Sequence, residues 1–515
     1  MRKNFFGGYP GGRPAGLALL SGILLTLAFP PFGLHFAAFF AFVPLLAALD
    51  GKRPATALLL GLAAGFVFFA ATIPWLYTAL SVYGHINTPL SILLMLLLDI
   101  YLALFFAIFA WLASRCTPGE AVIMAPVYFV ALEWARETLF SGFPWALLGE
   151  SQYAAPAMIQ IASFTGVAGV SFLIMFVNAA VNYFLRQVKQ GAASPLIPLA
   201  ALAVVALNVF WGMGAIGALE KAGGVPFTAA LVQGNIAQDE KWDPRFQDMV
   251  MGRYLGMTRE AALKKPDIII WPEAAVPFYF GNAPHYTGAV RAAARETGTP
   301  LLFGGLAFER GPLGEDRYFN SAFLIAPDGR EYRYDKIHLV PFGEYVPYRS
   351  ILSFARSVTN VIGGDVTAGE STEPIRVDGV TAGMQICYEI IFPEGSRAFA
   401  QRGARLMVNL TNDAWYGRSA ASAQEMTALP FRAVENRLPV LRAANTGISA
   451  AVTASGKIVH PTALFETITA VETVIIPPVA GQTFYTRFGG VFAYACVAMA
   501  VWHFIAGGWR RRKEP

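Results

Sequence analysis

The sequence is poor in charged residues, in cysteine and in histidine. Only 14% of its 515 residues are charged, whereas soluble globular domains have about a quarter. Three cysteines are too few for a disulfide framework, and the six histidines form no cluster with metal-ligand spacing. The net charge of +5 is not arranged as a basic stripe interleaved with aromatic residues. We therefore expect no metal, no cofactor and no nucleic-acid partner.

Long apolar segments account for the shortage of charge. Most of them reach the roughly 20 residues that a helix needs to cross a bilayer core. The eight apolar segments lie near 15–30, 33–50, 55–80, 89–114, 119–136, 166–186, 194–215 and 489–508. We expect that the first segment is not a cleavable signal peptide, because further spans follow it. The sequence thus predicts a polytopic α-helical membrane domain with about eight spans.

Lysine and arginine mark alternate loops between these segments. They precede the first span and follow the second, fourth, sixth and eighth: Arg2, Lys3, Arg13, Lys52, Arg53, Arg115, Arg186, Lys189, Arg510, Arg511, Arg512 and Lys513. The loops at 81–88 and 137–155 carry neither residue type. By the positive-inside rule, both termini are cytoplasmic and the chain beyond about residue 216 is external.

The composition changes near residue 219, where short apolar strands begin to alternate with amphipathic helical stretches. This alternation predicts an external α/β domain. We expect a membrane domain over 1–218, the external domain over 219–487, and a last span with a basic tail over 488–515. The predicted strands are 227–232, 267–271, 301–307, 321–326, 380–387, 405–410, 440–444, 448–454 and 471–476, and the predicted helices are 243–264, 284–297, 393–402 and 421–437.

One polar region lies at the outer end of the fifth span. Glu133, Trp134, Arg136 and Glu137 are followed by an apolar loop over 143–149 that contains Trp145. Charges at this depth usually face protein or water. The loop is either an interfacial aromatic belt or a lipid-lined floor beneath an external site.

Three separate hydrophobic segments of the external domain end in groups suited to acyl transfer. Cys387 supplies a thiol that reacts as its thiolate, Glu273 can act as the base, and Lys336 can stabilise an oxyanion together with the backbone N–H of Tyr388. Each also has a structural interpretation. A lone cysteine is most often a buried apolar residue, and the other two could be solvated strand ends. No G-x-S-x-G motif is present, and we expect His338 to be structural.

The segments around these residues resemble the nitrilase, or carbon–nitrogen hydrolase, superfamily. The resemblance lies in Trp271-Pro272-Glu273, Asp335-Lys336 and Cys387-Tyr388-Glu389. It implies an αββα sandwich and a Glu-Lys-Cys triad made of Glu273, Lys336 and Cys387.

Further segments are similar to the apolipoprotein N-acyltransferase family: 338–347, 409–417, and 232–235 with Lys241-Trp242. The overall plan of spans and external domain resembles that family as well. The resemblance implies supporting roles for Glu344, Tyr388 and Glu389. Substrate contacts are expected from the aromatic residues Trp242, Trp415, Phe342, Tyr345 and Trp145.

The family resemblance also implies the reaction. An acyl chain would pass from a membrane phospholipid to the cysteine thiol, and then to the α-amino group of a diacylated apolipoprotein. The expected location is the bacterial inner membrane, with the catalytic domain periplasmic and the enzyme a monomer. The alternatives are a membrane-tethered amidase or nitrilase acting on small amides, and a transporter or receptor with an inactive external domain.

Overall fold

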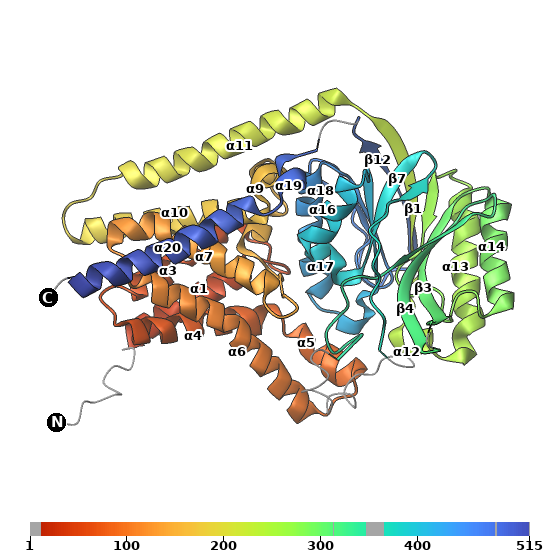
Figure 1. Cartoon of the computed structure of the whole chain (residues 1–515), viewed down its shortest axis with the longest axis horizontal. Helices are drawn as coiled ribbons and strands as arrows, with labels where there is room; N and C mark the ends of the chain where they lie inside the picture. Colours follow the sequence, from red (N-terminus) through yellow and green to blue (C-terminus); the bar gives the residue numbers. More distant parts are fainter. Residues whose placement is uncertain (1–11, 313, 347–364, 479–481, 514–515) are drawn as a thin grey trace. The chain divides into compact units, whose positions relative to one another are not determined.

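The computed structural model describes residues 12–312, 314–346, 365–478 and 482–513. The chain divides into a helical unit, with residues up to Leu76, Pro89–Ile216 and the chain from Phe488, and an α/β unit, with Tyr77–Thr88 and Gly217–Arg487. Figure 1 shows the elements of each. Arg2, Lys3 and Pro347, which entered the sequence predictions, lie outside the described residues.

Four of the described helices are long and apolar enough to cross a membrane. They are α4 (Pro54–Thr72), α6 (Thr88–Ala113), α10 (Val167–Lys189) and α11 (Leu196–Ala222). The remaining predicted spans fall on α1 (Gly12–Leu27), α2 (Ala38–Ala41), α3 (Val43–Ala48), α7 (Pro118–Thr138) and α20 (Val491–Lys513). The segment predicted at 33–50 is broken into short helices, and α7 contains four charged residues. About eight spans are therefore not shown by length and composition.

Two charges of α7, Glu133 and Arg136, face protein. Arg136 Nη1 donates to the carbonyl oxygen of Trp145 at 2.7 Å, and Glu133 Oε1 accepts from the backbone N–H of Leu148 at 2.6 Å. The Trp145 side chain is 3% exposed and packs against Trp75. The buried pair thus holds the loop that follows α7.

The α/β unit contains two six-stranded sheets. Their strand orders are β12-β1-β2-β3-β4-β5 and β11-β10-β9-β8-β7-β6. The strands are β1 (Val225–Gln233), β2 (Ile268–Ile270), β3 (Leu301–Arg310), β4 (Asp316–Ile325), β5 (Glu331–Asp335), β6 (Ile375–Val377), β7 (Val380–Ile386), β8 (Leu406–Thr411), β9 (Val440–Ala444), β10 (Ala450–Val452), β11 (Ile458–Val459) and β12 (Ile468–Ile476).

Helices cover the outer face of each sheet, as Figure 1 shows. The first sheet carries α13 (Gln247–Ala262) and α14 (Pro284–Thr297), and the second carries α16 (Pro393–Gln401) and α18 (Ala428–Asn436). The layers form the expected αββα sandwich. Between the sheets the strand side chains are almost wholly buried, because both faces of each sheet are covered.

All nine predicted strands are present, and α14 has its predicted bounds. The missed strands β5, β6 and β11 are edge strands. They are short or charged, as in the Glu-Tyr-Arg-Tyr-Asp sequence of β5, so they lack the apolar pattern of a central strand. The helix predicted at 421–437 is divided into α17 (Ala421–Glu425) and α18.

Candidate active site

The thiol of Cys387 is delivered by a sharp turn at the end of a buried strand. Strand β7 ends at Ile386, and Cys387 begins a short 3₁₀ helix, η6 (Cys387–Ile391). Cys387 has φ of 56°, a left-handed conformation that is unfavourable for a side chain with a Cβ. Such strain persists only where surrounding contacts maintain it, and it is concentrated at functional sites.

Glu389 supplies several of those contacts. Its Oε2 accepts the backbone N–H of Ile386 at 2.7 Å, and its Oε1 accepts the N–H groups of Ile337 and His338 at 2.8 and 2.9 Å. The carboxylate therefore ties the turn that carries the thiol to the segment after Lys336. Burial raises the pKa of Glu389 to about 7, against the opposing effect of these N–H donors.

Lys336 follows the edge strand β5 and is 1% exposed. Its Nζ lies 2.9 Å from Glu344 Oε1 and 3.7 Å from Glu273 Oε1. Burial disfavours the charged amine, but the two carboxylates outweigh that effect and raise the pKa of Lys336 well above its usual value. The side chain is therefore a buried cation over the working pH range.

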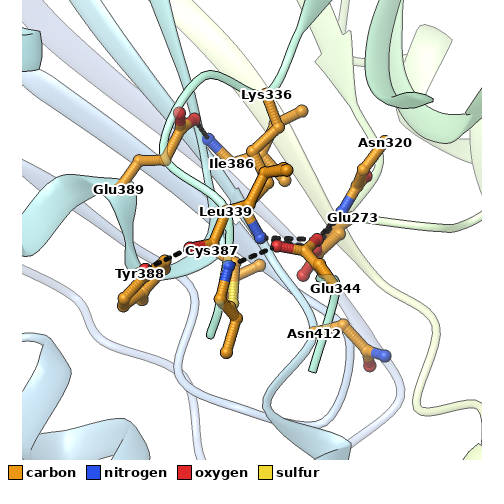
Figure 2. A network of polar contacts seen from close by, with 12 residues as sticks. Glu273, Asn320, Lys336, Leu339, Glu344, Ile386, Cys387, Tyr388, Glu389 and Asn412 are labelled. Atoms are coloured by element: carbon orange, nitrogen blue, oxygen red, sulfur yellow. Dashed lines mark hydrogen bonds and ion pairs between the residues drawn. The ribbon is translucent and has the colours of Figure 1, made fainter. Parts of the chain in front are cut away.

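Glu273 follows β2 and lies close to both Lys336 and the second glutamate. Asn320 Nδ2 donates to Glu273 Oε1 at 2.8 Å and to Glu344 Oε1 at 2.9 Å, so one amide bridges the two carboxylates. Gly304 makes room for this arrangement, because a Cβ there would lie 2.5 Å from Glu273 Cα. Figure 2 shows Glu273, Lys336, Glu344 and Cys387 gathered in one region.

The resting state of Cys387 is the neutral thiol. Burial and the Glu273 carboxylate raise the pKa of Cys387, and Lys336 opposes them. A base must therefore remove the proton before the sulfur can attack. A carboxylate, a buried cation and a thiol in one enclosed site can perform nucleophilic acyl transfer.

Two polar residues of this site were not identified as functional from the sequence. Asn320 lies inside β4, where nothing in the pattern marks it. Lys241 is fully buried, and its Nζ donates to the backbone carbonyl of Glu273 at 3.4 Å. Burial lowers the pKa of Lys241 to about 7, although Glu273 opposes the shift. The only sequence signal for Lys241 was its place beside Trp242.

The predicted aromatic residues lie in different surroundings. Tyr388 is buried and donates its hydroxyl to the Leu339 carbonyl at 2.7 Å. Trp242 and Tyr345 are half-buried. Phe342 and Trp415 are the most exposed, at 44% and 36%. Trp145 belongs to the helical unit, where it packs as described above.

The ring of Trp415 is contacted by a segment that lies outside the external domain in sequence. Tyr83 packs edge-on against Trp415, with ring centroids 6.0 Å apart. The segment Tyr77–Thr88 belongs to the α/β unit, although the sequence predicts the end of the span 55–80 and a short loop over 81–88 there. His338 stacks on Phe392 with ring centroids 3.7 Å apart, so its ring has a packing role.

Over the described ranges, no group of three or more His, Cys, Asp or Glu side chains is placed to hold a metal ion.

Two family models match the chain. Residues 21–180 match the apolipoprotein N-acyltransferase N-terminal domain, and residues 228–476 match the carbon–nitrogen hydrolase domain. The apolipoprotein N-acyltransferase of Geobacter metallireducens is 42% identical over 94% of this chain and 93% of its own. That of Brucella suis is 36% identical over 88% of both chains.

Solved structures of single α/β domains also match. A carbon–nitrogen hydrolase from Helicobacter pylori is 16% identical, covers 49% of this chain and 90% of its own, and has a TM-score of 0.37. A cysteine-to-alanine mutant of a Nesterenkonia amidase from the nitrilase superfamily is 20% identical, covers 51% of this chain and 93% of its own, and has a TM-score of 0.38. The match to the enzymes of G. metallireducens and B. suis extends over both units, and the chain belongs to the apolipoprotein N-acyltransferase family.

Proposed function

We propose that this chain transfers an acyl chain from a membrane phospholipid, through a thioester on Cys387, to the N-terminal α-amino group of a diacylglyceryl-cysteine apolipoprotein. The observation that carries the proposal is that the Cys387 thiol, Lys336 and the carboxylates of Glu273 and Glu344 lie together in one buried site. Kinship over 94% of the chain with a named apolipoprotein N-acyltransferase supports the choice of substrates.

In the first half-reaction, Glu273 takes the proton of the Cys387 thiol and the thiolate attacks the ester carbonyl carbon of the phospholipid. The carbonyl oxygen becomes an oxyanion, which Lys336 and the backbone N–H of Tyr388 stabilise. The C–O ester bond then breaks, and the leaving alkoxide takes the proton from Glu273. The products are a lysophospholipid and a thioester.

In the second half-reaction, the α-amine of the apolipoprotein attacks the thioester carbon. Glu273 takes a proton from the amine, the C–S bond breaks, and the leaving thiolate of Cys387 takes that proton from Glu273. The product is an amide, so the acceptor leaves as a triacylated lipoprotein. The two substrates react in turn, which predicts ping-pong kinetics.

Glu344 and Glu389 act as positioning residues in this scheme. Glu344 accepts from Lys336 and Asn320, and Glu389 ties together the segments that carry Lys336 and Cys387. The aromatic residues Trp242, Phe342, Tyr345 and Trp415 of the α/β unit are proposed to contact acyl chains, which gain about 0.8 kcal/mol per buried methylene.

We also propose eight membrane spans within 1–218 and 488–515, with both termini cytoplasmic and the domain at 219–487 periplasmic. The four candidate spans and the alternation of basic loops support this arrangement. We expect the enzyme to work as a monomer in the inner membrane.

Dependence of the reaction on the acceptor peptide distinguishes acyl transfer from hydrolysis by a membrane-tethered amidase. Purified protein is incubated with labelled phospholipid, with and without a synthetic diacylglyceryl-cysteine peptide. We expect labelled peptide in its presence and little free fatty acid in its absence. Rapid release of free fatty acid without the peptide, or efficient cleavage of short soluble amides, would favour the hydrolase.

A further inference from the structure

A row of polar side chains crosses three neighbouring strands beside the nucleophile. In the parallel pairing of β7, β8 and β9, Gln385 is opposite Asn409, and Asn409 is opposite Arg442. Residues opposite each other in a sheet project from the same face. Asn409 and Arg442 are completely buried, so this row runs through the interior and not over the surface.

Asn409 connects this row to the backbone of the nucleophile. Its Nδ2 donates to the carbonyl oxygen of Cys387 at 2.9 Å, and its Oδ1 accepts from Arg442 Nη1 at 2.8 Å. Arginine can only donate, so the oxygen of the Asn409 amide must face Arg442 and the NH₂ group must face Cys387. The orientation of the amide is therefore determined by its partners.

Arg442 is itself held in place. Its Nη2 lies 3.0 Å from Asp413 Oδ2 and 2.9 Å from Glu425 Oε2. Ser422 donates to the same Asp413 oxygen at 2.5 Å. Gly447 packs against this oxygen, and a Cβ at residue 447 would lie only 1.8 Å from it. A buried guanidinium with two carboxylate partners has little freedom to rotate.

The carbonyl that Asn409 holds shares its peptide plane with the backbone N–H of Tyr388. In a trans peptide these two bonds point in opposite directions. Fixing the Cys387 oxygen therefore fixes the direction of the Tyr388 N–H. That N–H belongs to the first turn of η6, where backbone donors have no partner within the helix.

We infer that Asn409, held by Arg442, is a positioning residue that aims the Tyr388 N–H at the developing oxyanion. The inference rests on the proposed nucleophile Cys387 and on the oxyanion role of that N–H. The left-handed φ of Cys387 explains why the hydrogen bond from Asn409 is needed. Without it, the peptide bond between Cys387 and Tyr388, at a strained position, can rotate so that its N–H no longer points at the oxyanion.

The test compares two reactions of the same sulfur. Acylation by phospholipid, followed by intact-mass spectrometry, needs the oxyanion hole, whereas alkylation by iodoacetamide needs only an accessible thiolate. Asn409→Leu has similar volume and removes the donor. We expect the ratio of acylation rate to alkylation rate to fall at least tenfold relative to wild type, since loss of one oxyanion donor costs about 10²–10³ in kcat.

Asn409→Asp retains the bond to Arg442 and lacks the donor to Cys387, so it carries the test if Asn409→Leu does not fold. Asn436→Leu is the matched control, because Asn436 is also buried and donates to a backbone carbonyl, that of Arg432. A fall of less than tenfold in a folded Asn409 variant, or an equal fall in Asn436→Leu, overturns the inference. Cys387→Ala is measured in parallel. Loss of all acylation in this variant supports Cys387 as the nucleophile, independently of the outcome for the Asn409 variants.

Discussion

At the scale of single residues, the site combines a neutral thiol with a permanent cation. The pKa of Cys387 is raised by burial and by Glu273, and that of Lys336 is raised by Glu344 and Glu273 despite burial. Lys336 therefore suits charge stabilisation and not proton abstraction. The base must be a carboxylate, and Glu273 is the proposed one.

Removal of the nucleophile or the base should abolish turnover without unfolding the protein. Cys387→Ala and Glu273→Gln are each expected to lower acyl transfer by about 10³-fold or more, because each role has one occupant. Thermal denaturation in detergent checks folding. Cys116→Ala, at a half-buried cysteine of the helical unit, should leave activity unchanged. Near-normal turnover in Cys387→Ala would exclude a thioester mechanism.

Loss of the cation should suppress the thiolate. Lys336→Met removes the charge that opposes the raised pKa of Cys387, so that pKa should rise further. An opposite charge within about 4–6 Å shifts a pKa by about 1–3 units, and we expect iodoacetamide alkylation at pH 8 to slow at least tenfold. Lys457→Met, at an exposed lysine, is the control. Superimposable alkylation profiles for Lys336→Met and wild type would contradict the assignment.

At the scale of elements, the segment after Lys336 forms a tight turn held by two glutamates. The backbone N–H of Phe342 donates to the Tyr345 carbonyl at 2.8 Å, and Val340 N–H donates to Glu344 Oε2 at 2.8 Å. Glu389 holds its beginning at Ile337 and His338. Glu389 thus fixes the beginning of the turn, and Phe342 is exposed. From its proline and glycine residues we predict that the loop Pro341–Pro347 is a hinged flap.

Glu344→Ala should affect both catalysis and this turn. It removes the partner of Lys336 Nζ and the acceptor of Val340 N–H. We expect turnover to fall about 10- to 100-fold and hydrogen exchange of the peptide covering residues 337–346 to accelerate. Exchange that is uniformly slow in both proteins, with and without phospholipid, would exclude a flap.

The elements of the α/β unit could be predicted where strands are apolar and central. The strand ends that carry Glu273 and Cys387 follow from the same pattern, whereas Lys336 follows β5, which was not predicted as a strand. The edge strands β5, β6 and β11 were missed because their sequences are charged or short, whereas the edge strand β12 was predicted. Arg442 was not selected as functional, because its partner Asn409 is set by the register between β8 and β9. Asn320 was not selected because its partners Glu273 and Glu344 lie on other segments of the chain. Single-sequence periodicity contains no information on that register.

At the scale of the whole molecule, the helical unit explains why such a site belongs to a membrane enzyme. Four described helices can cross a bilayer by length and composition. A hydrolase of small soluble amides has no need for them. Both proposed substrates are anchored in the membrane, so an active site tethered to the membrane meets them by diffusion in two dimensions and not three.

Topology is tested with single cysteines in a variant that lacks the three native ones. Lys457→Cys, at an exposed position of the α/β unit, should react with an impermeant maleimide in spheroplasts. Lys52→Cys, in a predicted cytoplasmic loop, should react only after permeabilisation. The opposite pattern would place the α/β unit in the cytoplasm and contradict the proposed orientation.

The central claim is a thioester on Cys387 that waits for an amine. Protein purified with phospholipid is analysed by intact-mass and peptide mass spectrometry, before and after addition of a diacylglyceryl-cysteine peptide. We predict one acyl adduct, located on Cys387, that persists in phospholipid alone and disappears as the triacylated peptide forms. An adduct on another residue, or a Cys387 adduct lost equally fast without the peptide, would contradict the account.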